Sequence, residues 1–207
     1  ATLALGLPPP PLARPQQLAT LCAIALEAGI EPDYCCDMIA RGGLCPPADA
    51  PESWPWPVRI YTLGRFDLVL DGTPLHKRGK APSKALELLK TLVALGGQQV
   101  SSERLTQLLW PDASPTQAQA AFGMALHRLR KLMPVDAALR LDDTRLSLNP
   151  DYCWVDAAQL ERSIDRLLAD IHEYPPSAEW LVELGRYRAP FLSLDGAFHW
   201  AAERRDR

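Results

Sequence analysis

Residues 100–133 read VSSERLTQLLWPDASPTQAQAAFGMALHRLRKLM, and this segment is the most informative about the fold. Its first half has the apolar spacing of a short helix that begins after a serine cap and stops at Pro111. In the loop that follows, Ser114 is placed to cap a new helix and Pro115 to occupy its first position. The pattern therefore predicts two successive helices joined by a short turn, the later one spanning Pro115–Met133.

The later helix has two chemically different faces. Apolar residues recur at three- and four-residue steps, which predicts one buried face. That face consists of Ala118, Phe122, Ala125, Leu126, Leu129, Leu132 and Met133. The residues that face directly away from it are Thr116, Ala120, Met124, His127 and Lys131, with Arg128 and Arg130 on the flanks. No acidic residue occurs from Thr116 to Met133, so we expect the outward face to contact an anionic partner.

The segments on either side complete the architecture. From Val58 the apolar period changes to two, which predicts short strands with a hairpin at Asp71-Gly72. A helix is predicted over Pro82–Leu95, and a second hairpin over 139–148 about the tight turn 142–145. The predicted fold class is therefore α+β: a small antiparallel sheet, three helices and a C-terminal wing hairpin, flanked by helical segments. In such a winged helix-turn-helix the third helix enters the DNA major groove.

Four segments are expected along the chain. Residues 1–45 contain two short helical patterns, and we expect them to be the tail of an upstream sensor or repeat domain. Residues 46–57 form a linker, because PPADAPESWPWP has too much proline for a helix or a central strand. Residues 58–155 form the winged-helix domain, and residues 156–207 begin a further helical domain. Since the chain lacks an initial methionine and ends on AAERRDR in a helical pattern, we expect a piece of a longer protein.

The net charge of −3 hides a division along the chain. Residues 1–57 hold 2 Lys and Arg against 6 acids, and residues 150–207 hold 7 against 11, so each of these parts has a net charge of −4. Residues 58–149 hold 13 against 8, a net charge of +5. A basic middle segment between acidic flanks indicates a polyanionic partner for that segment alone.

Composition narrows the classes of protein to consider. No apolar run approaches the roughly 20 residues that span a bilayer, so we expect no membrane contact and a cytoplasmic location. Five cysteines without a C-x-x-C pair favour a reducing compartment. Buried or idle thiols are favoured over a metal or redox site made of Cys35, Cys36 and Cys45. We expect no metal and no cofactor, and no enzyme, since neither a nucleophile motif nor a complete phosphate loop is present.

The segments LGRFDLVLDGTPL, APSKALELLKTLVAL and the stretch 100–133 resemble one family. Together they are similar to the winged-helix domain of SARP-type (antibiotic regulatory protein) regulators, a branch of the OmpR-like effector domains. The specific features are LWPD at the end of the second helix, small residues at the start of the third, and the leucine-arginine pattern of LHRLRKLM. Residues 184–207 also resemble the start of the bacterial transcriptional activator domain, a tetratricopeptide-like helical array.

The resemblance implies a regulator of transcription, an activator, that binds double-stranded DNA in a sequence-specific way. It also implies that the loop between the second and third helices contacts RNA polymerase. That loop consists of Pro111, Asp112, Ala113 and Ser114. Self-association on repeated half-sites is a further expectation for such a regulator.

Individual roles follow from the outward side of the third helix. Base-edge contacts are expected from Gln117, Ala120, Met124 and His127. Phosphate contacts are expected from Thr116, Arg128, Arg130 and Lys131, from Thr144 and Arg145 on the wing, and from Ser83 and Lys84 at a helix start with free N–H groups. Gly123 costs helix stability of roughly 1 kcal/mol, which either close approach to DNA or tight packing on the second helix would explain. Asp142 and Asp143 near the wing tip would repel phosphate unless they cap the turn.

A second interpretation is a protein–protein interaction module. A degenerate winged helix that acts as a scaffold in a larger signalling protein would explain the acidic flanks on either side of the basic segment.

Overall fold

The structure, a computed structural model, describes residues 14–77, 82–170, 185 and 189–193. The chain divides into two compact units, Ala1–Trp56 and Pro57–Arg207, and each is described by itself. Within the described residues, no helix is both long and apolar enough to cross a membrane.

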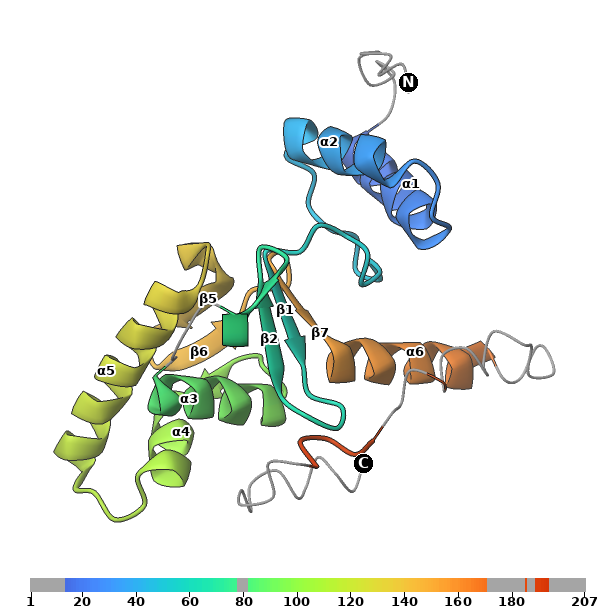
Figure 1. Ribbon diagram of the computed structural model, residues 1–207. Coiled ribbons are helices and arrows are strands. Elements are labelled where there is room, and N and C mark those ends of the chain that lie inside the picture. The colour runs from blue at the N-terminus through green and yellow to red at the C-terminus, as the bar shows by residue number, and fades with distance from the viewer. Residues whose placement is uncertain (1–13, 78–81, 171–184, 186–188, 194–207) are drawn as a thin grey trace. The chain divides into compact units, whose positions relative to one another are not determined.

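The first unit contains two helices joined by a tight turn (Figure 1). Helix α1 spans Pro15–Glu27 and helix α2 spans Pro32–Gly42, and each begins with the proline that suits a first helical position. Gly43 ends α2 in the left-handed conformation, with φ 55°. The buried residues of the pair are Ala19, Cys22, Ala23, Leu26, Cys35 and Ile39. The two short helices predicted for this part of the chain are present.

The proline-rich segment after α2 forms turns. Residues 46–57, all of which are described, contain neither helix nor strand, as predicted. Trp54 and Trp56 are buried with their ring centroids 6.5 Å apart. Trp56 Nε1 donates to the carbonyl of Pro51 at 2.8 Å, which satisfies the buried indole and fixes this turn locally.

All five cysteines are free thiols. Burial raises the pKa of the Cys22 thiol of α1 and of the Cys35 thiol of α2, and Cys35 Sγ donates to the carbonyl of Ile30 at 3.7 Å. Cys36 is half-buried and Cys45 is exposed. Burial in the second unit raises the pKa of Cys153 to about 12. Among the described residues there is no group of three or more side chains that could hold a metal ion.

A four-stranded sheet with strand order β3-β2-β1-β7 opens the second unit. Its strands are β1 (Val58–Tyr61), β2 (Asp67–Leu70), β3 (Thr73–Pro74) and β7 (Cys153–Val155). The β2–β3 connection has positive φ at Asp71 (47°) and Gly72 (72°), as the predicted Asp-Gly hairpin requires. β7 pairs parallel with β1, which differs from the purely antiparallel sheet that was predicted. The chain reaches β7 only after a long crossover through the helices and the wing, and such a crossover permits a parallel pair.

Three helices pack together beside this sheet (Figure 1). They are α3 (Ser83–Ala94), α4 (Ser102–Leu109) and α5 (Pro115–Leu132), all within two residues of their predicted bounds. Helix α5 lies against both α3 and α4. Phe122 of α5 is 2% exposed and belongs to the hydrophobic core, together with the inward-facing residues of β1 and β2. Trp110 packs against that core and is half-buried.

The wing is a second sheet, with strand order β4-β6-β5. Its strands are β4 (Val100–Ser101), β5 (Leu139–Asp142) and β6 (Arg145–Leu148), and short 3₁₀ turns lie at Leu75–Lys77 and Asp136–Ala138. β5 and β6 form the predicted hairpin, with Asp143 at its tip in the left-handed region (φ 54°). The N–H of Ser102 donates to the carbonyl of Thr144 at 2.7 Å, which fastens the wing to the start of α4. The predicted α+β winged-helix architecture is confirmed.

Helix α6 (Asp156–Asp170) continues directly from β7. The Asp156 carboxylate accepts hydrogen bonds from the N–H and hydroxyl of Thr62, the N–H of Leu63 and the N–H of Ala157, at 2.7–2.9 Å. Thr62 is fully buried. A single side chain therefore accepts from the first N–H after the start of α6 and fixes the helix to the end of β1.

A short later segment also packs on the sheet. Phe191 and Leu192 belong to the core, and the N–H of Leu192 donates to the carbonyl of Thr62 at 2.7 Å. The helical domain predicted over 156–207 lies, after Asp170, outside the described residues apart from Gly185 and 189–193, and these few residues form turns, bends and a bridge instead of the predicted helix.

Candidate nucleic-acid interface

Helix α5 begins with a reciprocal cap. Ser114 Oγ accepts from the N–H of Gln117, and Gln117 Oε1 accepts from the N–H of Ser114 (3.2 Å) and from its hydroxyl (3.0 Å). The side-chain oxygen of Gln117 is therefore occupied, and only its amide N–H groups remain to meet a ligand. The spacing Ser-x-x-Gln is the sequence signature of a capping box. It would have identified this role of Gln117, which sequence reasoning assigned to base contact alone.

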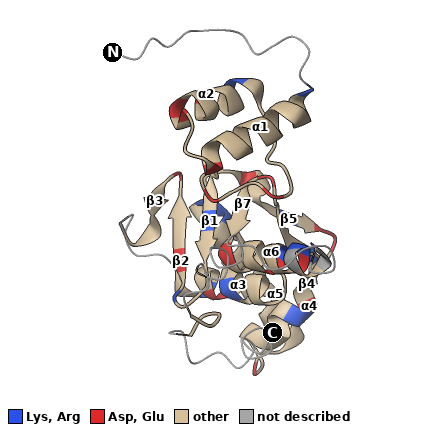
Figure 2. Cartoon of the chain, turned by 90° about the vertical axis from the view of Figure 1, so that its right-hand side faces the viewer, with Lys and Arg blue, Asp and Glu red and all other residues tan. Residues whose placement is uncertain are grey.

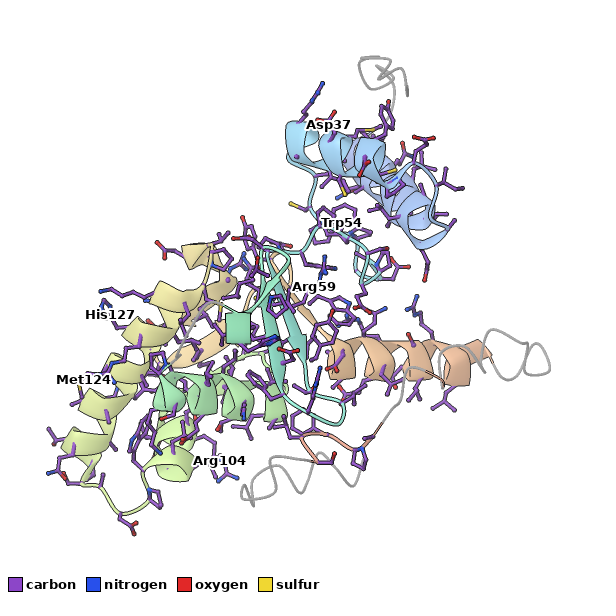
Figure 3. All side chains as sticks on the ribbon, in the orientation of Figure 1. Asp37, Trp54, Arg59, Arg104, Met124 and His127 are labelled. Atoms are coloured by element: carbon purple, nitrogen blue, oxygen red, sulfur yellow. The ribbon has the colours of Figure 1, made fainter. Side chains whose placement is uncertain are left out.

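The two faces of α5 are as the sequence predicted. Ala118, Phe122, Ala125, Leu126, Leu129 and Met133 are buried, and Leu132 is half-buried. Thr116, Ala120, Met124, His127 and Lys131 are all exposed. Figure 3 shows Met124 and His127 projecting from α5 on the side away from α3 and the first sheet. The fold thus presents one complete helix face to solvent.

Gly123 lies in the middle of this helix and is exposed. A Cβ atom added to it would meet nothing within 4 Å. Tight packing on α4, one of the two explanations considered from sequence, is therefore wrong. The fold itself has no steric need for glycine here, although glycine weakens a helix interior by roughly 1 kcal/mol relative to alanine.

The cations of α5 are available for an external partner. Arg128 and Lys131 are exposed and Arg130 is half-buried. Within the described part of the chain, none of the three forms an ion pair with an acid. Figure 2 marks further Lys and Arg residues on α3 and α4. Of these, Lys84 is already paired, with its Nζ 2.7 Å from Glu87 Oε2.

The start of α3 carries two further candidates for phosphate contact. Pro82 is the N-cap residue and makes no side-chain cap, while the N–H groups of Ala85 and Leu86 bond to its carbonyl. Ser83 and Lys84 precede them in the first turn, where N–H groups have no partner within the helix. Both residues are exposed, so a phosphate could approach this helix end.

The wing contributes one cation and two acids near its tip. Arg145 is exposed, and its Nη1 donates to the carbonyl of Gln99 at 3.1 Å, which holds the guanidinium against the base of the wing. Thr144, Asp142 and Asp143 are exposed as well. Within the described residues the carboxylates of Asp142 and Asp143 accept no hydrogen bond that would cap the turn. The wing therefore offers one exposed cation beside two exposed acids, whereas α5 offers cations and no acid.

Comparison with known proteins adds little beyond this geometry. No protein-family model and no curated protein matches the chain. The chain is similar to a solved structure of Mycobacterium tuberculosis EmbR in complex with a low-affinity phosphopeptide, with 18% sequence identity and a TM-score of 0.46. The match covers 71% of this chain, which spans 40% of that one. A likeness at this level carries no argument about function, and the fold assignment stands on the topology described above.

Proposed function

We propose that the second unit is a sequence-specific, double-stranded DNA-binding domain of a transcriptional regulator. Helix α5 would lie in the major groove, with the hairpin 139–148 beside it as the wing. The observation that carries this proposal is the exposed side of α5. It has no acid, its cations are unpaired within the described residues, and it includes a glycine with open space beside it. A polyanion that the helix backbone approaches closely accounts for all three features.

The exposed positions divide by chemistry into two sets. Ala120, Met124, His127 and the amide N–H groups of Gln117 would face base edges, since they lie on the outward side of the helix. Cationic and hydroxyl groups would contact phosphates and set the position of the domain on the duplex. This second set is Thr116, Arg128, Arg130 and Lys131 of α5, Thr144 and Arg145 of the wing, and Ser83 and Lys84 of α3.

The finer regulatory roles rest on the family resemblance. We propose a cytoplasmic activator, not an enzyme, whose exposed residues Pro111, Asp112 and Ser114, with half-buried Ala113, contact RNA polymerase. Residues 156–207 would begin a helical activator domain, and residues 1–45 would belong to an upstream sensor. Self-association on repeated half-sites would follow if the selected DNA contains such repeats.

Titration against salt tests the proposal. The full chain is expected to bind a duplex selected from a random pool. The logarithm of its affinity should fall linearly with the logarithm of the salt concentration, by about 0.9 per phosphate contacted.

Arg128→Ala should lower the affinity for selected and scrambled duplexes alike and reduce the slope of the salt dependence by about one unit. His127→Ala should cost roughly 1–3 kcal/mol on the selected duplex only.

Arg41→Ala is the matched control, because Arg41 lies in the first unit and pairs with Asp37 at 2.8 Å. It should leave both affinity and slope unchanged. Salt-independent binding, or no binding at low salt, would instead favour the protein-interaction module.

A second prediction concerns Gly123, whose replacement by alanine should raise stability and lower DNA affinity. Gly123→Ala should stabilise the second unit by roughly 1 kcal/mol, because the new methyl group meets no atom and the residue favours helix. The same methyl group should lower DNA affinity, since it holds the backbone away from the groove. Thermal melting and the duplex titration measure the two effects on one sample. If stability rises and affinity is unchanged, the backbone at Gly123 does not approach DNA.

A further inference from the structure

Met124 is the feature of α5 that the fold explains least. It is 58% exposed, and among the described residues from Val58 to Val155 no other large apolar side chain is classed as exposed. The other exposed large apolar residues lie in the first unit and on α6. The remaining large apolar side chains of α5 are buried or half-buried. Met124 therefore adds nothing to the core and leaves an apolar surface in water.

The neighbours of Met124 define what it could contact. Ala120 lies one turn before it on the same face and presents only a methyl group, while Gly123 beside it presents no side chain. His127 and Arg128 lie one turn after it, and both are exposed. Figure 3 shows Met124 and His127 on the same outward side of the helix. The site is a small apolar patch with hydrogen-bond donors along one border.

On the proposed function, this patch has one matching chemical group in the major groove. Of the groups on base edges there, the C5-methyl of thymine is the one that projects an apolar group into the groove, while recognition of the other bases uses hydrogen-bond donors and acceptors. A protein partner is a poorer fit, since protein hot spots combine several large apolar or aromatic side chains. Here a single thioether stands beside unpaired cations.

We infer that Met124, supported by Ala120, reads a thymine C5-methyl group, and that His127 donates to an acceptor on a neighbouring base pair. The inference rests on the proposed DNA binding and adds a specificity to it. Met124 is the specificity-determining residue, and the preferred site contains a thymine whose methyl group is needed for full affinity.

Deoxyuridine is the probe, because it removes the methyl group of thymine and keeps its hydrogen-bonding groups. The full chain is titrated against the duplex selected from a random pool, with each thymine replaced in turn by deoxyuridine. At one position the wild type should bind about fourfold more weakly, the effect of withdrawing one buried methyl group. Met124→Ala should bind the thymine duplex about fourfold more weakly and should no longer distinguish thymine from deoxyuridine at that position.

Two further variants separate this contact from a general effect on the helix. Met124→Leu keeps an apolar side chain and should retain the discrimination. Gln119→Ala changes an exposed residue about 140° away around the same helix and should also retain it. Because Met124 and Gln119 are both exposed, all three variants should have the melting temperature of the wild type.

The outcomes distinguish this inference from the proposed function. Salt-dependent binding with every deoxyuridine tolerated, a selected site without thymine, or full discrimination by Met124→Ala would overturn the inference and leave DNA binding intact. No salt-dependent binding to any duplex would overturn both.

Discussion

Phe122→Ala is expected to lower the free energy of unfolding of the second unit by about 3–5 kcal/mol. Phe122 is 2% exposed and lies on the side of α5 that packs on α3 and α4. Its removal withdraws a large apolar surface and leaves a cavity that the three helices close only in part. The expected loss would lower the melting temperature by more than about 10 °C in a domain of this size.

Met124→Ala is the matched control, since Met124 is on the same helix, two residues later, and is 58% exposed. It should change the melting temperature little. The two variants should differ in the opposite way in DNA affinity, which should fall for Met124→Ala and not for Phe122→Ala. On the proposed function, the Phe122→Ala variant should bind DNA almost normally at a low temperature at which it is still folded, because Phe122 is buried and does not lie on the exposed face of α5. A Phe122→Ala variant as stable as wild type would show that α5 is not held by this core.

Strong local signals explain why most of the fold could be predicted from the sequence. A serine caps α4, as predicted, and the structure identifies it as Ser101; Ser114 caps α5 and Asp71-Gly72 forms the hairpin, both as predicted. Capping and tight turns are decided within four residues, so a short pattern is sufficient. The amphipathic spacing of α5 likewise predicted which of its residues are buried.

Pairings between distant segments could not be predicted in this way. β4 is two residues long, too short for any periodic signal, and it becomes a strand because it pairs with β6. The parallel pairing of β7 with β1 joins residues almost a hundred positions apart. Nothing in either segment alone specifies its partner or its direction.

The candidate site likewise has some features that the sequence predicts and others that only the fold reveals. The exposure of Ala120, Met124 and His127 follows from helical periodicity and was predicted. The choice between two explanations for Gly123 needed the positions of all neighbouring atoms, which only the fold supplies. The bond from Arg145 to Gln99 likewise depends on the pairing of the wing with the segment before α4.

Asp156→Ala is expected to have the second large effect on stability. The carboxylate accepts from the N–H and hydroxyl of Thr62, which is fully buried, and from the N–H of half-buried Leu63. Alanine would leave these donors unpaired, at about 1–3 kcal/mol for each one that stays buried. Since water can reach the less buried of them, we expect a total loss of about 3 kcal/mol or more. Urea unfolding followed by circular dichroism measures it.

Two further variants identify the cause of this loss. Asp156→Asn keeps one acceptor oxygen but turns an N–H donor toward the remaining N–H and hydroxyl groups. Its free energy of unfolding should therefore lie between those of the wild type and Asp156→Ala. Asp165→Ala removes an exposed acid from the same helix and should change stability little. Equal stability of Asp156→Ala and wild type would show that these hydrogen bonds contribute nothing net.

The location of Asp156 gives this variant a meaning beyond stability. Its hydrogen bonds join the first residue of α6 to the end of β1, and none of them involves α5 or the wing. Asp156→Ala should therefore loosen the start of α6 while the α5 face and its DNA affinity are retained below the melting transition. Near-ultraviolet circular dichroism reports on the same place when the Trp154 contribution is isolated, among the six tryptophans, as the difference from a Trp154→Phe variant, because the Trp154 and Tyr61 rings meet edge-on with centroids 5.4 Å apart. If that signal changes while DNA affinity does not, the attachment of α6 and the reading of DNA are independent within this unit. A parallel loss of DNA affinity would mean that α6 and α5 are coupled through β1.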